Sequence, residues 1–318
     1  MIDFLQALSR LAMVGFVLRL LLHLAIALSF PPLLLGIIGK VKAFFGGRVG
    51  PPVLQPYRDL LRLFRKGFVF SHTTTWVFRA GPVVGLITVA LAMVLMPLGS
   101  HRAPLAFGGD VLVFAGLLGL GRFFTVAAAL DTGSSFEGMG AAREATFSAL
   151  AEPGLFLGLM VLVRHATGAS LDLMLSTEGT ARAWETTPGA LVMVAVSFFA
   201  LLLVENSRIP VDDPATHLEL TMIHEVMVLD HSGPAFGLIQ YGAALKLFVF
   251  AALVVNVAFP VTSGNPELDW VLFLGAVVAL AVGVGVLEST MARLRLLHVP
   301  RLLVASSILS VFGIILGS

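Results

Sequence analysis

The chain has 318 residues, of which 58% are apolar and 12% are charged, and its mean hydropathy is +0.97. Soluble domains carry about 25% charged residues, so this composition excludes a soluble enzyme. The net charge of +1 argues against nucleic-acid binding. Because the chain contains no cysteine, it cannot build a disulfide, a thiolate zinc site or an iron–sulfur cluster.

Eight stretches are long and apolar enough to cross a bilayer, which needs roughly 20 residues per helix. The first stretch lacks a small-residue cleavage site, so we expect it to remain in the mature protein. Its Pro31-Pro32 pair predicts a break or kink near one face. We therefore predict an all-α integral membrane protein, with residues 1–318 forming a single polytopic domain. The predicted spans are residues 11–38, 81–98, 111–130, 145–163, 190–204, 236–259, 270–287 and 302–317.

The distribution of Lys and Arg predicts the orientation of these spans. Thirteen of the 20 basic residues follow the first, third, fifth and seventh spans, whereas four lie on the opposite side. Cytoplasmic loops carry the excess of basic residues, so both termini are predicted to lie outside. The predicted cytoplasmic segments are residues 39–80, 131–144, 205–235 and 288–301.

The first cytoplasmic segment, residues 39–80, is basic. Its Arg58, Arg62 and Arg65 recur at helical spacing, with leucine and phenylalanine residues between them. This pattern predicts an amphipathic helix over residues 58–66 that lies on the membrane surface. Two interpretations remain open, ordinary anchoring by positive charge and docking of a partner.

The third cytoplasmic segment, residues 205–235, carries six of the 19 acidic residues of the chain. Asp213 and Pro214 predict the start of a helix, as its N-cap and its first residue. One polar arc of that helix would hold His217, Thr221, His224 and Glu225. The remaining positions are mostly apolar, which favours burial over a solvated hairpin. The two histidines are seven residues apart and lack the HExxH pattern, so we predict no metal site.

Several ionisable residues fall inside the predicted spans, where each charge is costly and requires a partner or water. They are Arg19, His23, Arg122, Glu152 and Lys246, with Glu205 at a boundary. Glu152 precedes a Pro-Gly pair that we expect to interrupt its helix and free carbonyl groups. These residues favour a proton or ion path, while static ion pairing for helix packing is the alternative. The predicted path comprises Glu152, Glu205, Asp212, Glu219, Glu225 and Lys246.

Four motifs spread over all the cytoplasmic segments are RVGPPVLQPYRDLLRLFRKG, LDTGSSFEGMGAAREATFSALAEP, ENSRIPVDDPATHLEL and ESTMARLRL. They resemble the membrane subunit shared by respiratory complex I, where it is subunit 1 or H, and group 4 membrane-bound [NiFe]-hydrogenases. The four motifs are more similar to the hydrogenase-4 and formate hydrogenlyase branch than to complex I. Complex I members read ExxRxPFDLPExExEL in the third motif. In this chain Val211 replaces the Phe, and Ala215 and His217 replace two acids.

The resemblance implies a non-catalytic coupling subunit in a prokaryotic inner membrane. It would dock a peripheral arm made of hydrogenase-like large and small subunits and a ferredoxin-like iron–sulfur subunit. It would also contact lipid and antiporter-like membrane subunits. The NiFe centre and the iron–sulfur clusters would sit in those partners, and this chain would hold no cofactor of its own. The residues assigned to docking or to charged clusters are Arg48, Arg58, Arg62, Arg143, Arg208, Asp213, His217 and His224.

Two alternatives to this function remain open. The chain could be the quinone-cavity subunit of an NADH:quinone oxidoreductase, with quinone as its ligand. It could instead be a stand-alone transporter, for which we would expect an internal repeat with matched broken helices. We find no such repeat.

Overall fold

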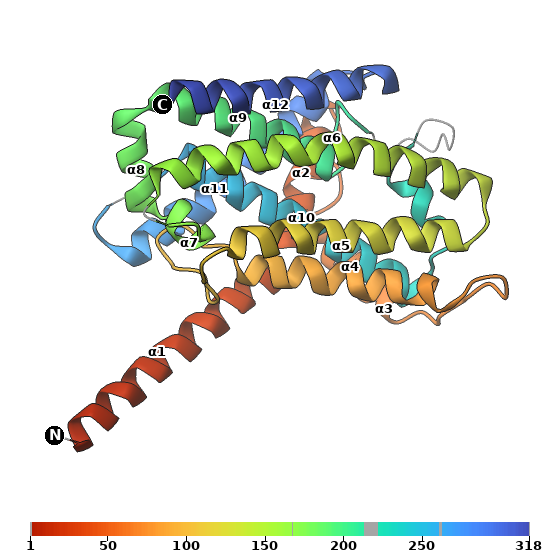
Figure 1. Cartoon of the computed structure of the whole chain (residues 1–318). Helices are drawn as coiled ribbons and strands as arrows, with labels where there is room; N and C mark the ends of the chain where they lie inside the picture. Colours follow the sequence, from red (N-terminus) through yellow and green to blue (C-terminus); the bar gives the residue numbers. More distant parts are fainter. Residues whose placement is uncertain (1, 167, 213–221, 261–262, 318) are drawn as a thin grey trace.

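The computed structural model describes residues 2–166, 168–212, 222–260 and 263–317. Within these ranges the chain is a bundle of long helices that run roughly parallel or antiparallel, with α1 projecting away from the rest (Figure 1). The helices are α1 (Ile2–Ser29), α2 (Pro31–Phe45), α3 (Gln55–Phe64), α4 (Trp76–Val94), α5 (Asp110–Asp131), α6 (Ser135–His165), α7 (Leu171–Met174), α8 (Thr177–Thr186), α9 (Pro188–Glu205), α10 (Gly233–Ala258), α11 (Pro266–Thr290) and α12 (Val299–Leu316). Two short 3₁₀ turns lie between helices: η1 (Glu225–Val228) precedes α10, and η2 (Leu296–His298) precedes α12.

Eight segments of the described chain are long and apolar enough to cross a membrane, which confirms the predicted fold class and span count. The break predicted at the proline pair is also present, because α1 ends at Ser29 and α2 begins at Pro31. Proline is tolerated in the first turn of a helix, where its missing N–H has no acceptor. Apolar side chains of α1 such as Leu18 and Leu21 are exposed.

Helix α10 lies at the centre of the bundle. Every residue from Leu247 to Val257 is buried, and all of these side chains except Asn256 pack with those of α2, α4, α9 and α11 in one continuous apolar core. An α-helix that is apolar on all sides is typical of a membrane span or a large core. The rest of the bundle is therefore organised around α10, which also carries Lys246.

Helix α6 differs from the sequence-based predictions in two ways. The segment 131–144 was predicted as a loop, but α6 already begins at Ser135. The helix also continues through Pro153, where an interruption was predicted. Proline within a membrane helix is tolerated where packing against neighbouring helices supports the segment, and here the Ser310 hydroxyl of α12 donates to the carbonyl of the adjacent Gly154 at 3.2 Å. The result is a single helix that carries Glu144 and Glu152 on one rigid element.

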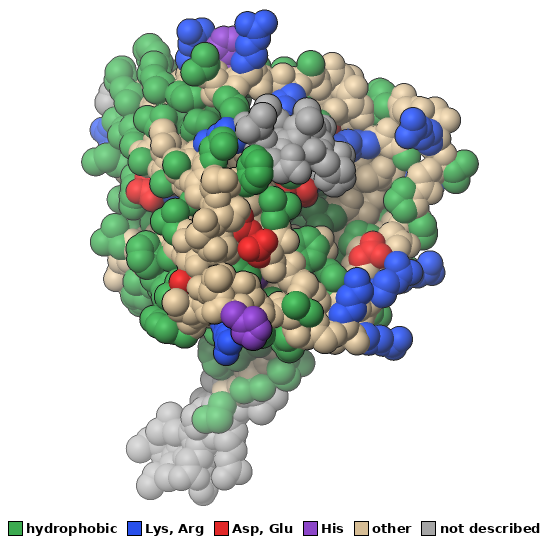
Figure 2. Space-filling model, turned by 90° about the vertical axis from the view of Figure 1, so that its right-hand side faces the viewer, with side chains coloured by type: hydrophobic (Ala, Val, Ile, Leu, Met, Phe, Trp, Pro, Cys, Tyr) green, Lys and Arg blue, Asp and Glu red, His purple; other side chains and the backbone are tan. Residues whose placement is uncertain are grey.

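The predicted amphipathic helix is confirmed as α3, which has no buried residue. It lies against the start of α10, where Leu63 and Phe64 approach Gly237. Arg58 and Arg62 are exposed. We refer to the end of the bundle that carries α3 as the α3 face, and to the end that carries α7 and α8 as the α8 face. Basic side chains gather toward the margins of the α3 face (Figure 2).

Asp131 fixes the start of α4 on the α3 face. Its carboxylate accepts from the backbone N–H of Thr75 at 2.7 Å and of Phe78 at 3.2 Å, and from the Thr75 hydroxyl. We expect Asp131→Ala to lower the free energy of unfolding in detergent by about 2 kcal/mol, because charged hydrogen bonds at a helix N-terminus are lost. Glu185→Ala, which removes an exposed acid, is the matched control. Equal stability of the two variants would contradict this role.

Candidate functional site

Five ionisable side chains from four helices meet inside the bundle. Glu205, the last residue of α9, accepts from Arg122 of α5 at 2.9 Å and pairs with Lys246 of α10 at 2.8 Å. The Arg122 guanidinium also reaches Glu152 at 3.2 Å and Glu144 at 4.0 Å, both on α6. Four helices that are otherwise apolar therefore place their charges at one point. We call these five residues the charge cluster.

Burial within the charge cluster is uneven. The side chains of Glu205, Arg122, Glu144 and Lys246 are between 7% and 17% exposed. Glu152 is different, because 51% of its side chain is exposed. The cluster contains three carboxylates and two cations, so it carries one excess negative charge when every group is ionised.

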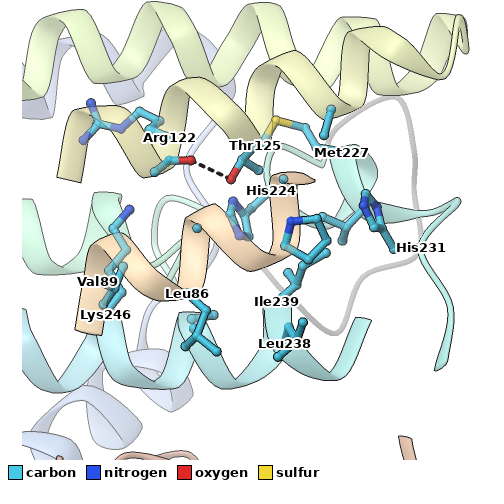
Figure 3. Close-up of a pocket in the computed structure, with 18 of the residues that line it drawn as sticks. Leu86, Val89, Arg122, Thr125, His224, Met227, His231, Leu238, Ile239 and Lys246 are labelled. Atoms are coloured by element: carbon cyan, nitrogen blue, oxygen red, sulfur yellow. Dashed lines mark hydrogen bonds between the residues drawn. The ribbon is translucent and has the colours of Figure 1, made fainter. Parts of the chain in front are cut away.

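A cavity of about 80 Å³ adjoins the charge cluster between α4, α5, α6 and α10. Figure 3 shows Arg122 and Lys246 toward one side of it, His231 toward the other and His224 between them. Glu144 and Thr125 also line it, and Leu86 and Val89 belong to its apolar part. Since one water occupies about 30 Å³ in the liquid, the cavity has room for a few water molecules.

Residues 222–231 close this cavity and are held by charged residues from other segments. Asp212 accepts from the backbone N–H of Ile223 at 2.9 Å and of His224 at 3.4 Å, and it pairs with Arg293 at 2.8 Å. Arg143 of α6 donates to the Met222 carbonyl at 2.7 Å. We call residues 222–231 the cavity wall. Burial lowers the pKa of His224 and outweighs the opposing effect of the nearby Glu144 carboxylate, so the neutral imidazole is favoured at pH 7.

The α-helix predicted after Asp213 is not present in the cavity wall. Residues 222–224 are not helical, and only the 3₁₀ turn η1 follows. The physical reason is that Asp212 takes two backbone N–H groups that a helix would direct to its own carbonyls. Glu225 begins this turn and is half-buried. Asp213, His217, Glu219 and Thr221 lie outside the described residues.

We also expected Glu205, Arg208 and Asp212 to form a compact charged cluster where the fifth span ends. Each of the three pairs with a residue from another part of the chain. Arg208 pairs with Glu288, at the end of α11, at 3.5 Å. Glu288 in turn pairs with Lys42 of α2 at 2.9 Å. Tertiary packing therefore distributes these neighbouring charges over separate ion pairs.

The structure brings some predicted site residues together and leaves others apart. Glu152, Glu205 and Lys246 belong to the charge cluster, and His224 lies next to it. Arg48, Arg58 and Arg62 are exposed on the α3 face, away from the cavity. The residues that we did not assign to the site from the sequence are Arg122, Glu144, Glu288, Arg293 and Lys42. Arg122 was detectable as a charge inside a span, whereas the others lay at span ends or in predicted loops.

We expect Asp212→Asn to loosen the cavity wall. The amide keeps one acceptor oxygen but loses the charge that pairs with Arg293. A cysteine introduced as Met227→Cys is a clean reporter, because Met227 is fully buried and the chain has no cysteine. Its labelling by a maleimide should become about tenfold faster, which corresponds to ~1.4 kcal/mol of local stability. Asp230→Asn is the matched control, since Asp230 is exposed in the same segment. Unchanged labelling would refute the anchoring role of Asp212.

Comparisons with known proteins agree with this architecture. The family model described as NADH dehydrogenase matches residues 18–317. Formate hydrogenlyase subunit 4 of Escherichia coli (strain K12) is 34% identical over 294 residues, covering 89% of this chain and 92% of that protein. Hydrogenase-4 component C of the same organism is 32% identical over 279 residues, covering 86% of each.

The fold also matches a solved structure. A chain in the structure of the membrane-bound sulfane sulfur reductase, an archaeal respiratory membrane complex, superposes with a TM-score of 0.80 at 22% identity. The match covers 96% of this chain and all of that one. Since the family model spans nearly the whole chain and both E. coli relatives exceed 30% identity, the chain belongs to the NADH dehydrogenase family, whose membrane subunit its four motifs resemble.

Proposed function

We propose that this chain is the membrane-anchoring, ion-coupling subunit of a group 4 [NiFe]-hydrogenase-like complex of the formate hydrogenlyase or hydrogenase-4 type. The observation that carries the proposal is the charge cluster, which links the cavity under the cavity wall to the outer surface of α6. The E. coli relatives, named as formate hydrogenlyase and hydrogenase-4 subunits, support the assignment to this type of complex.

The geometry supports a coupling mechanism based on exchange of ion-pair partners. Arg122 has carboxylates at 2.9, 3.2 and 4.0 Å, so small movements change which one it neutralises. A carboxylate that loses this cation takes up a proton or another cation more readily. The cavity wall is held to α6 and to the segment after α11 by Arg143 and Asp212, so a movement of the docked arm would reach the cluster through it.

The proposed setting is the inner membrane of a prokaryote, with both termini outside and the α3 face in the cytoplasm. The excess of Lys and Arg in the segments on that face supports this orientation. The proposed partners are hydrogenase-like large and small subunits, a ferredoxin-like iron–sulfur subunit and antiporter-like membrane subunits. The NiFe centre and iron–sulfur clusters belong to those partners, because a chain without cysteine offers no thiolate ligands for them.

Purification of the complex from its native membrane tests this proposal directly. Recovery of a NiFe large subunit with the chain would support it. Recovery of NADH-oxidising flavoprotein subunits would instead favour a quinone-cavity subunit, which the family description also suggests.

We expect the double variant Arg58→Glu/Arg62→Glu to release the peripheral arm while the membrane part stays assembled. Both side chains are exposed on α3, and reversing their charge replaces attraction of an acidic partner surface with repulsion. Recovery of the arm during purification should fall about tenfold or more. The control is Arg102→Glu/Arg182→Glu, which reverses two exposed charges on the α8 side of the bundle. Undiminished recovery after the first change would exclude docking at α3.

A further inference from the structure

Glu152 is a half-exposed carboxylate within a membrane-spanning helix. It lies 13 residues before the end of α6 at His165, which is about 20 Å along the helix axis. A bilayer core is about 30 Å thick, so this depth places Glu152 within the hydrocarbon region. A carboxylate that faces lipid there is costly, and such residues face protein or water instead.

The charge cluster contains more carboxylates than cations. Arg122 is shared by three carboxylates, and Lys246 pairs with Glu205. Among the described residues, His224 is the other basic group that interacts with the cluster, and its lowered pKa leaves it neutral. When the three carboxylates and the two cations are all ionised, one negative charge remains, and Glu152 is the only member of the cluster that is more than 17% exposed.

The surface around Glu152 fits a closely packed helix. Exposed positions on the same side of α6 in the preceding turns include Ala142, Ala145 and Ala149. Small side chains allow helix backbones to approach closely in membranes. Phe156 and Met160 continue this side of α6 beyond Glu152 and are also exposed. We call the surface formed by these six residues the Glu152 face.

We propose that the Glu152 face binds a transmembrane helix of another membrane subunit, and that this helix places a Lys or Arg side chain against Glu152. The proposal rests on the proposed function only in assuming that the chain works within a membrane complex. The half-exposed carboxylate at membrane depth and the uncompensated negative charge select a basic partner helix over lipid. The small residues at three exposed positions provide the space for its backbone.

The absence of cysteine allows a direct test in the complete complex. Ala149→Cys, one turn from Glu152, is labelled with a photoactivatable benzophenone maleimide in native membranes, and the adduct is mapped by mass spectrometry. We expect a cross-link to a transmembrane helix of another subunit with a Lys or Arg within one turn of the attachment point. Ala279→Cys is the control, since it is an exposed alanine within the α11 span that carries no neighbouring charge. We expect it to give no adduct with that helix.

Charge reversal then tests the partner chemistry. Glu152→Lys should reduce the Ala149 adduct about tenfold, and the reverse change of the mapped basic residue to Glu should restore it. Adducts with lipid only, or with a helix that has no basic residue near the contact, would overturn the proposal. So would an adduct that Glu152→Lys leaves unchanged. Because the readout is a membrane contact, it is independent of whether a NiFe subunit co-purifies, and the two proposals can fail separately.

Discussion

Glu205→Gln is expected to cause the largest loss of stability of any single substitution in the charge cluster. The carboxylate of Glu205 holds both Arg122 at 2.9 Å and Lys246 at 2.8 Å. Its removal leaves two buried cations in a membrane with only the more distant acids of α6 to compensate them. Breaking a buried ion pair by removing one partner costs about 3–5 kcal/mol. We expect a fall of this size in the free energy of unfolding in detergent, with a lower yield of assembled complex.

A double variant separates loss of the ion pair from loss of packing. Lys246→Met removes the ammonium group and keeps a flexible apolar side chain of similar length. Glu205→Gln combined with Lys246→Met should therefore be more stable than Glu205→Gln alone, because one of the two stranded cations is gone. If Glu205→Gln is as stable as the parent chain, or if the double variant is the less stable of the two, the charge cluster does not hold the helices together.

The spans were predictable because bilayer thickness fixes the length of apolar sequence that a helix needs. The predicted span 111–130 and α5, Asp110–Asp131, agree to one residue at each end. The start of α6 was not predictable in the same way. Residues 135–144 are helical and mix charged, apolar and glycine residues, and nothing in their hydropathy separates a helix that extends beyond the membrane from a loop.

The members of the charge cluster were partly predictable for a related reason. A charge inside a span is conspicuous in sequence, which identified Arg122, Glu152 and Lys246. The pairing between them is a tertiary property, since the partners lie on different helices up to 83 positions apart, as for Arg122 and Glu205. Glu144 was overlooked because the sequence pattern placed it in a loop.

The cavity wall shows where local sequence patterns mislead. The apolar spacing after Asp213 favours a helix, but Asp212 and Arg143 bind the backbone at residues 222–224 and hold it in a non-helical form. Those contacts come from ten or more positions away in sequence. Helix propensity contributes a few tenths of a kcal/mol per residue, whereas each hydrogen bond to a charged group contributes about 1.5–3 kcal/mol. The tertiary contacts therefore decide the local structure.

Glu152→Gln is the substitution with the largest expected effect on coupling. In the parent chain Arg122 donates to Glu152 at 3.2 Å. The carbonyl oxygen of Gln can still accept this hydrogen bond, but the amide cannot carry a proton or a negative charge. If Glu152 is the outer end of the ion path, the complex should assemble and the number of ions moved per electron pair should fall by about half or more. This ratio is measured on the purified complex in sealed vesicles, with redox turnover recorded in parallel.

The control for this variant is Glu178→Gln, which removes an exposed acid on the α8 side of the bundle and should leave the ratio unchanged. The alternative explanation is static ion pairing, in which Glu152 serves only to hold α6 against α5 through Arg122. That explanation predicts poor assembly, with normal coupling in the complexes that do form. Complete assembly with normal, fully coupled turnover would remove Glu152 from the path, because a side chain that cannot titrate would then serve as well as one that can.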